Sequence, residues 1–367
     1  MKSKYVIGLN SGTSFDGIDV ALVQFQNGSL KPIFIDGILC EYPRSVKERI
    51  RRLIIGEGAD NYPHLREISQ LNFLLGEIFA DAALKMIKKV RARHGMPLLI
   101  ASHGQTIFHN PGKSSLQIGE SSVIAERTGI KTISNFREAD IAAGGQGAPL
   151  MPFLDEVVFG RGALQRALLN IGGISNVTIV GNNITPIAFD IGPGNALIDL
   201  IAKKYFKKDF DKDGKLARKG EINFKMVEKT LKDPYFKKKP PKSTGKEYFN
   251  EGFIKDYFSK IKDKYNKIAT VTYLTAKTIA DSVRKYNVKE IIISGGGVRN
   301  KTLMRHLRNL LPDLKIVISD KYGLPWKYKE AMLFALLGYT CYLRKPNNIP
   351  SCTGAKKKVI LGKMINV

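Results

Sequence analysis

Two predicted β-hairpins, each with a glycine-containing turn, are the feature that most constrains the fold of this chain. In the first, the apolar run 5–9 enters a turn at 10–14, and partly alternating residues resume at 18–25. In the second, the run 167–171 meets Gly172 and Gly173, and 177–180 returns from them. Short apolar or alternating runs bounded by glycine indicate antiparallel strands. Glycines let backbone N–H groups approach phosphate oxygens, so both turns are candidate phosphate-binding turns.

The elements that follow each hairpin include both strands and helices. Residues 65–90 carry apolar side chains at helical spacing and predict one long amphipathic helix. The polar, lysine-rich stretch 203–267, which contains Pro240-Pro241, indicates a surface insertion with helices. The other predicted elements are strands at 33–39, 98–102, 187–190 and 290–294 and helices at 268–286, 302–311 and 331–343.

This order of elements predicts an α/β chain of two domains. At 367 residues the chain exceeds the usual size of a single hydrophobic core. Two similar halves, each opening with a phosphate-binding hairpin, are typical of the actin/sugar-kinase (ribonuclease H-like) fold, in which two α/β domains hold a nucleotide in the cleft between them. We expect residues 1–134 and 331–367 to form domain I and residues 135–330 to form domain II.

The composition excludes several classes of protein. No apolar run reaches the roughly 18 residues that span a bilayer, and the N-terminal apolar stretch is too short for a signal peptide. We therefore expect a cytoplasmic protein with no membrane association. Three widely spaced cysteines form no CxxC pair, and five histidines show no metal-ligand spacing. No disulfide framework and no zinc site are expected.

The net charge of +26 is the most unusual bulk property. Such a charge can attract nucleic acid through long-range electrostatics. The basic residues are dispersed as single and paired lysines, densest at 203–267, and no basic helix or RNA-binding motif accompanies them. A solvated lysine-rich surface is therefore the favoured interpretation. An anionic small substrate, including a nucleotide, is also compatible with this charge.

Three glycine turns are candidates for nucleotide binding. In the turn 12–17, hydroxyl groups add donors, and Asp16 can hold the Mg²⁺ that bridges phosphates; the alternative is an ordinary tight hairpin turn. The Gly172-Gly173 pair has the same alternative, a glycine pair that serves strand twist. The run 295–297 lies between a predicted buried strand and a helix, where a planar ring can pack on backbone and an anion can bind the helix N-terminus. Neither a Walker A lysine nor a GxGxxG before a helix is present, which argues against P-loop and Rossmann folds.

Asp190 is the candidate general base. It ends an apolar strand and precedes the glycine turn 192–194, where a carboxylate can accept a proton from a sugar hydroxyl or from water. The alternative is an Asx-turn or a cap of the helix that follows. The surrounding glycine turns favour catalysis.

Further polar residues are candidates for contact with a substrate. His103 and Gln105 follow a predicted strand and could bind hydroxyl groups, although a lone histidine is more often structural than catalytic. Arg137 and Asp140 precede the glycine-rich segment 144–149, which is either a loop that closes on substrate or an ordinary surface loop. The polar segment 242–247 is compatible with a solvated turn.

Taken in order, these segments resemble the anhydro-N-acetylmuramic acid kinase family. The matching segments cover the chain from residue 6 to about 363. They are SGTSFDGIDVALV (11–23), SHGQTIFHNP (102–111), LQIGE (116–120), FREADIAAGGQGAPLMP (136–152), LNIGGISNVT (169–178), FDIGPGNALID (189–199), PPKSTGKEYFN (240–250), SGGGVRN (294–300), KEAMLFALLGY (329–339) and IPSCTGA (349–355). Asn10 and Ser134-Asn135 depart from the pattern, since the family usually has a methionine at the first position and a small residue followed by aspartate at the second.

The resemblance implies the sugar-kinase/actin fold and a reaction that uses ATP and Mg²⁺. Such enzymes open the 1,6-anhydro ring of anhydro-N-acetylmuramic acid with water and phosphorylate O6, giving N-acetylmuramic acid 6-phosphate and ADP, as in peptidoglycan recycling. Asp190 would activate the water. The residues assigned to ATP are Gly12, Thr13, Ser14, Phe15, Asp16, Gly17, Ile18, Asp19, Gly172, Gly173, Gly295, Gly296 and Gly297. The residues assigned to the sugar are His103, Gln105, Arg137, Asp140, Asn195 and Glu330.

Two alternatives stay open beside this interpretation. One is a kinase of the same fold that acts on another anhydrosugar, such as levoglucosan, or on a plain sugar. The other is a basic nucleotide-binding or nucleic-acid-binding protein without sugar chemistry. The expected partners are ATP and a small anhydrosugar, with nucleic acid not expected and a homodimer left open.

Overall fold

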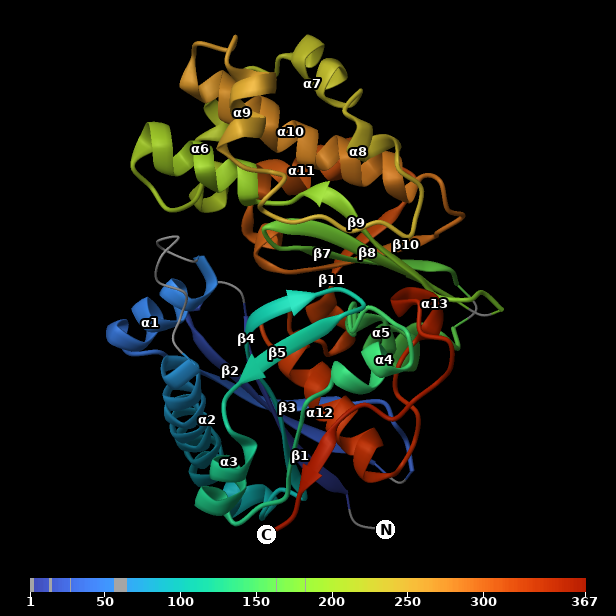
Figure 1. Ribbon diagram of the computed structural model, residues 1–367. Helices are drawn as coiled ribbons and strands as arrows, with labels where there is room; N and C mark the ends of the chain where they lie inside the picture. The colour runs from blue at the N-terminus through green and yellow to red at the C-terminus, as the bar shows by residue number, and fades with distance from the viewer. Residues whose placement is uncertain (1–2, 13–14, 27, 56–64, 163, 182) are drawn as a thin grey trace. The chain divides into compact units, whose positions relative to one another are not determined.

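The computed structural model describes residues 3–12, 15–26, 28–55, 65–162, 164–181 and 183–367 (Figure 1). The chain divides into two compact units, each with its own β-sheet. Unit 1 comprises Met1–Val158 and Gly323–Val367, and unit 2 comprises Phe159–Tyr322. Thr13 and Ser14, both assigned to ATP from the sequence, lie outside the described residues.

Unit 1 is built on a mixed sheet with the strand order β12-β6-β4-β1-β2-β3, to which β5 adds beside β4. β1, β2 and β3 are antiparallel neighbours, whereas β4 and β6 run parallel to β1. The elements are β1 (Lys4–Ser11), β2 (Gly17–Phe25), β3 (Ile33–Glu41), α1 (Arg44–Ile55), α2 (Leu65–His94), β4 (Leu99–Asn110), β5 (Ser114–Ile118), α3 (Ser121–Thr128), β6 (Thr132–Ser134), α4 (Glu138–Ala142), α5 (Met151–Phe159), α12 (Lys329–Tyr342), α13 (Pro350–Thr353) and β12 (Lys363–Ile365).

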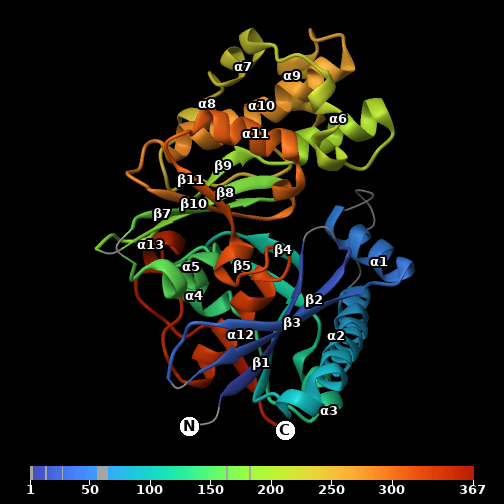
Figure 2. The same ribbon diagram turned by 180° about the vertical axis from the view of Figure 1, so that it is seen from behind.

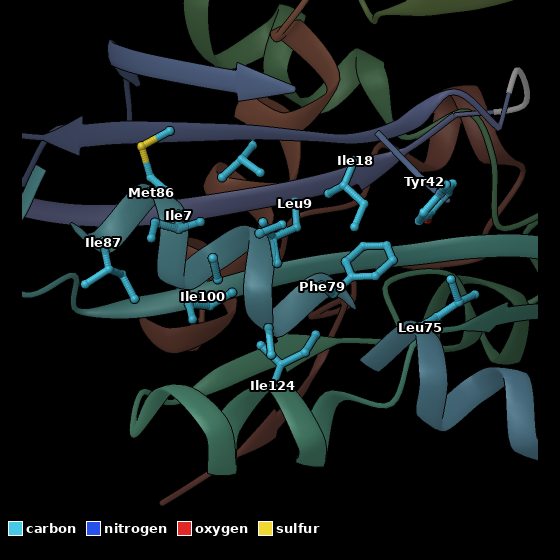
Figure 3. Packing of buried hydrophobic residues seen from close by; sticks show 14 of the residues in the cluster. Ile7, Leu9, Ile18, Tyr42, Leu75, Phe79, Met86, Ile87, Ile100 and Ile124 are labelled. Atoms are coloured by element: carbon cyan, nitrogen blue, oxygen red, sulfur yellow. The ribbon is translucent and has the colours of Figure 1, made fainter. Parts of the chain in front are cut away.

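Alternation along β1 explains how helices cover both faces of this sheet. Ile7 and Leu9 are fully buried in a cluster with Phe79 of α2 (Figure 3). The residue between them, Gly8, faces α12, and the carbonyl of Ala331 occupies the place that a Cβ would need. Because successive side chains of a strand point to opposite faces, one short apolar run serves both helix layers. The glycine lets α12 pack directly against the β1 backbone.

Unit 2 repeats the core strand order of unit 1. Its sheet has the order β11-β10-β7-β8-β9, in which β7, β8 and β9 are antiparallel neighbours and β10 and β11 run parallel to β7. Helices α10 and α11 cover one face of it (Figure 2). The elements are β7 (Arg166–Ile171), β8 (Ile174–Val180), β9 (Ile187–Pro193), α6 (Ala196–Phe206), η1 (Lys212–Gly214), η2 (Ala217–Lys219), α7 (Phe224–Thr230), α8 (Pro234–Lys237), α9 (Glu251–Phe258), α10 (Lys264–Val283), β10 (Glu290–Ser294), η3 (Gly296–Arg299), α11 (Lys301–Leu310), β11 (Lys315–Ile318) and η4 (Ser319–Tyr322).

An ionic cluster anchors the start of β10 to its neighbours in unit 2. The Glu290 carboxylate accepts hydrogen bonds from Arg166 Nε at 2.9 Å and from the Tyr322 hydroxyl at 2.6 Å. Lys315 Nζ lies 2.7 Å from the same carboxylate. Although burial raises the pKa of Glu290, these partners outweigh burial and lower the pKa to about 2.

The lysine-rich stretch 203–267 forms helices, as predicted, but it is more than a surface insertion. Helices α7, α8 and α9 pack on α6 and α10 around a cluster of their own. Phe249 and Phe258 are fully buried in this cluster. The sequence did not indicate this cluster, because many lysines separate its aromatic residues along the chain.

The boundaries of the units differ from the predicted ones. We expected them at 134/135 and 330/331, whereas they fall at 158/159 and 322/323. Side-chain contacts with the C-terminal part of the chain explain the shift. Asp140 accepts hydrogen bonds from Asn348 and Thr353, and Asp155 of α5 forms a buried ion pair with Lys329 of α12 at 2.8 Å. Arg137, Asp140 and Glu330 therefore belong to unit 1.

The structure confirms the predicted α/β architecture and both hairpins. β1 pairs with β2, and β7 with β8, in antiparallel register across the two glycine turns. Within the described part of the chain, every helix is too short or too polar to cross a membrane.

Candidate active site

The end of β1, where the first glycine turn begins, lies beside the middle of β4. The Ser11 hydroxyl is 2.6 Å from Gln105 Oε1 and 3.1 Å from the carbonyl of Gly17, so it can donate to either. Ser11 and Gln105 are buried. The Gln105 side chain therefore holds the end of β1 in place, while a Cβ at Gly12 would meet no atom of the described residues within 4 Å. The open side of Gly12 leaves backbone available to a ligand.

Asp19 is a partly buried carboxylate on β2, close to this turn. Its Oδ1 atom is buried and has no hydrogen-bond partner among the described residues. Burial raises the pKa of Asp19 to about 6, while Lys327 lowers it and Glu330 and Asp16 raise it. A buried carboxylate oxygen without a partner is costly to a fold and indicates a place for a cation or a donor from a ligand. Asp16, in contrast, is exposed.

Arg137 pairs with His103, which lies within β4. His103 Nε2 accepts hydrogen bonds from Arg137 Nη2 at 3.0 Å and from Nε at 3.3 Å. His103 Nδ1 lies 3.1 Å from the carbonyl of Gly104, which requires the proton to be on Nδ1. Burial, with the Arg137 charge second, lowers the pKa of His103 well below its ordinary value. His103 is therefore neutral and orients the guanidinium instead of acting as a base.

The Arg137 charge is itself set by its surroundings. Burial lowers the pKa of Arg137 to about 10, against the raising effect of the Glu330 and Glu138 carboxylates, so the guanidinium remains protonated at neutral pH. Its Nη1 donates to the carbonyl of Gly147 at 2.8 Å. The exposed Glu330 accepts a hydrogen bond from Asn10 Nδ2 at 2.7 Å. Asn10, which departs from the family pattern, thus belongs with Arg137, His103 and Glu330 to one group of polar residues, the Arg137 cluster.

Asp140 holds the loop 144–149 in place. It is fully buried, and its Oδ2 accepts from the backbone N–H of Gly147 at 2.9 Å. Its Oδ1 accepts from Asn348 Nδ2 at 2.9 Å and from the Thr353 hydroxyl at 2.7 Å. All of these donors come from the protein, and they leave no exposed carboxylate to meet a sugar. The geometry therefore favours a positioning role for Asp140 over the predicted contact with substrate.

The second glycine turn, in unit 2, is closed by the start of α6. The backbone N–H groups of Gly194 and Ala196 donate to the carbonyl of Gly173 at 2.9 and 3.0 Å. Asn195 Nδ2 donates to the carbonyls of Gly172 and Ile171 at 3.1 and 3.3 Å. Asn195, predicted to contact substrate, therefore uses its side-chain amide to hold the turn.

The three glycines 295–297 lie between β10 and α11, as predicted. Cβ atoms at Gly295 and Gly297 would collide with Ile171 of β7, at 2.7 Å from its carbonyl oxygen in the first case. A Cβ at Gly296 would meet no atom within 4 Å in the part of the chain that the structure describes. Two of the glycines are thus required for packing of the turn on β7, and the third leaves an open backbone surface.

Asp190 lies on β9 with one carboxylate oxygen fixed by a hydrogen bond and the other without a hydrogen-bond partner among the described residues. Its Oδ2 accepts from the backbone N–H of Thr244 at 3.0 Å, and the Tyr235 hydroxyl donates to its backbone carbonyl at 2.7 Å. Burial raises the pKa of Asp190, while the Thr244 N–H and the Lys242 charge lower it. A half-buried carboxylate in a fixed orientation is suited to accept a proton.

Two lysines near these elements were not singled out from the sequence. Lys242 Nζ lies 4.5 Å from the centre of the Tyr235 ring, and burial lowers its pKa to about 8. Lys246 extends across the Gly173 turn, where its Cε would lie 2.7 Å from an added Cβ. Both belong to the segment PPKSTGKEYFN, so its match to the family was the signal that could have identified them.

The strand order shared by the two units, with a glycine turn after the first strand of each, defines the actin/sugar-kinase fold. The chain belongs to the anhydro-N-acetylmuramic acid kinase family, whose model matches residues 4–366. It is therefore a phosphotransferase of the kinase class.

Relatives named anhydro-N-acetylmuramic acid kinase match along the whole chain. That of Caldanaerobacter subterraneus subsp. tengcongensis is 42% identical over 391 residues, covering 99% of this chain and 97% of the relative. That of Clostridioides difficile is 42% identical, with 98% and 97% covered, and that of Bacillus cereus is 39% identical, with 98% of each covered. Among solved structures, the activator of 2-hydroxyisocaproyl-CoA dehydratase from Clostridium difficile is 13% identical, with a TM-score of 0.45 over 90% of this chain and 93% of that one.

Proposed function

We propose that this chain uses ATP to convert anhydro-N-acetylmuramic acid and water into N-acetylmuramic acid 6-phosphate and ADP. The observation that carries the proposal is the Asp190 carboxylate, which the Thr244 N–H holds by Oδ2 while Oδ1 remains available. In the proposed reaction Asp190 takes a proton from the water that attacks the anomeric carbon. The bond from that carbon to O6 breaks, and O6 takes the γ-phosphoryl group of ATP.

The nucleotide side of the proposal rests on the three glycine turns. Backbone N–H groups at Gly12 and at the Gly172-Gly173 turn would bind phosphate oxygens, with Lys246 beside the Gly172-Gly173 turn as a further cation. The open backbone at Gly296 would face adenosine. Contacts of this kind would position the γ-phosphoryl group and neutralise its charge, which are the main requirements of phosphoryl transfer.

A magnesium ion fits the first turn on the evidence of Asp19. Among the described residues no cluster of three or more metal-ligating side chains exists. Mg²⁺ in kinases is commonly held by one or two carboxylates together with phosphate oxygens and water, so a single orphaned oxygen is sufficient. Asp19 Oδ1 would hold the ion, with the exposed Asp16 as a second candidate. When bound, Mg²⁺ supplies charge neutralisation for the phosphates.

The sugar side of the proposal rests on the Arg137 cluster in unit 1. A protonated guanidinium, the Glu330 carboxylate and Asn10 together offer donors and acceptors of the kind that bind hydroxyl, amide and carboxylate groups. His103 fixes the guanidinium, and Gln105 holds the end of β1 in place. Asp140 and Asn195 act by positioning backbone.

The experiment that tests this proposal measures ADP release from ATP and Mg²⁺, with and without 1,6-anhydro-N-acetylmuramic acid, and with levoglucosan in parallel. We expect strong stimulation by the muramic sugar and a 6-phosphate product. Stimulation by levoglucosan alone would keep the mechanism and change the substrate. No stimulation by either sugar, together with DNA or RNA binding that falls steeply with salt, would contradict the proposal in favour of a nucleic-acid-binding protein.

A further inference from the structure

Unit 2 contains a cavity of about 330 Å³ that none of the proposed site residues lines. It lies among α6, α9 and the first turn of α10; in Figure 1 the lime-green helix α6 lies beside the yellow to orange helices α9 and α10. Its lining is rich in lysine, with a tyrosine, a serine and one carboxylate. The polar lining residues are Lys204, Tyr205, Glu251, Lys255, Ser259 and Lys267.

Lys267 is the unusual member of this lining because it is a buried cation. Only 5% of its surface is exposed. Its Nζ donates to the Tyr205 hydroxyl at 3.2 Å and lies 4.6 Å from the centre of the same ring. No carboxylate of the described residues lies within ion-pair distance of it. Burying an ammonium group is costly unless an anion or several acceptors compensate it, and here one neutral hydroxyl does so.

The remaining charges of the cavity do not supply the missing anion. Glu251 pairs with Lys204 at 2.7 Å, and both side chains are at least half exposed. Ion pairs of this exposure contribute little to stability. Lys255 adds a third ammonium group, so the lining carries three cations and one carboxylate that is already engaged.

We propose that this cavity binds a small anion carrying a phosphate group, with Lys267 as its buried anchor. A phosphate carries between one and two negative charges near neutral pH and accepts several hydrogen bonds, which suits a site with more than one lysine. Lys204, Lys255 and the Ser259 hydroxyl are placed on the same lining to complete its contacts. The cavity is larger than a phosphate ion, so a phosphate monoester also fits. This site does not depend on the proposed function.

The test is isothermal titration calorimetry of the wild-type protein with inorganic phosphate and, separately, with glucose 6-phosphate. Potassium chloride at the same ionic strength is the control titrant. The decisive variant is Lys267→Met, which keeps the length of the side chain and removes the buried charge. The matched control is Lys264→Met, an exposed lysine on the first turn of the same helix that does not line the cavity. Tyr205→Phe, which removes the one hydroxyl partner of Lys267, serves if Lys267→Met does not fold.

We expect Lys267→Met to weaken binding by about tenfold or more, since it removes a charged hydrogen bond to the anion. Lys264→Met should change affinity by about twofold or less, because an exposed charge is screened. Tyr205→Phe should weaken binding by about threefold or more, because it frees the ammonium group from its fixed position. Equal affinity for both anions would show recognition of the phosphate group alone, and tighter binding of the monoester would show that its sugar also contacts the cavity. Absence of binding at millimolar anion, or equal binding by wild type and Lys267→Met, would overturn the proposal.

Discussion

Replacing Asp140 with alanine should destabilise unit 1 and disturb the Arg137 cluster, although Asp140 itself touches no ligand in our account. The substitution leaves three buried donors without their acceptor: the Gly147 N–H, Asn348 Nδ2 and the Thr353 hydroxyl. Each buried donor left unsatisfied costs about 1–3 kcal/mol, offset in part by removal of a buried charge. We therefore expect the free energy of unfolding to fall by about 3 kcal/mol.

Asp140→Asn should show part of the same loss. An asparagine at this position can place its carbonyl oxygen toward Gly147 or toward Asn348, but not toward both, so at least one pair of donors must face each other. Rotation of Asn348 does not help, because its Oδ1 already accepts from the N–H of Val359 at 2.8 Å. The expected cost is about 1–2 kcal/mol.

Urea denaturation followed by circular dichroism measures both effects. The matched control is Asp81→Asn, which removes an exposed carboxylate paired with Arg127 and should change stability by less than about 0.5 kcal/mol. The Asp140→Ala midpoint should fall well below that of this control. Equal midpoints for Asp140→Ala and Asp81→Asn would refute the view that Asp140 anchors the loop 144–149.

Three other predictions follow from single contacts. Asp19→Asn should stabilise the free protein at pH 7.5 by about 1–2 kcal/mol, because the raised pKa of Asp19 means that the wild type loses stability as pH rises through about 6 and the variant does not. The advantage of the variant should vanish below about pH 4. Calorimetry should also show that the variant has lost Mg²⁺-dependent nucleotide binding. Gly297→Ala should lower the unfolding temperature, since its Cβ has no room, whereas Gly296→Ala should alter nucleotide affinity at unchanged stability; equal stability losses would contradict this. Glu290→Gln should lower the free energy of unfolding by about 2 kcal/mol at pH 7. The difference from wild type should disappear as pH falls from about 5 toward 2, because the lowered pKa of Glu290 stabilises the fold only above that range. A difference independent of pH would contradict this prediction.

The sequence predicted the elements whose side chains are uniformly buried. β10 is buried at every position and was predicted at 290–294 without error. β4 was predicted only to 102, whereas it continues to Asn110. The second half of this strand leaves the core and alternates polar residues with the exposed Phe108, so it lacks the apolar run that marks a buried strand.

The unit boundary could not be predicted from local pattern. It depends on Asp140, whose partners Asn348 and Thr353 lie 208 and 213 positions further along the chain. Local sequence propensities contain no information about contacts between residues so far apart in the chain. The candidate site shows the same limit, since the sequence marked Asp190 by its turn, but the N–H group that orients its carboxylate comes from Thr244, 54 positions away.

The most direct test of the central claim is the Asp190→Asn variant, with nucleotide binding and sugar-dependent ADP release measured on the same preparation. Asparagine keeps an oxygen for the Thr244 N–H but cannot take a proton from water. The account predicts unchanged nucleotide affinity and an ADP release rate in the presence of 1,6-anhydro-N-acetylmuramic acid lower by about 10²–10⁴-fold. A rate near that of wild type, with nucleotide still bound, would contradict the assignment of Asp190 as the base.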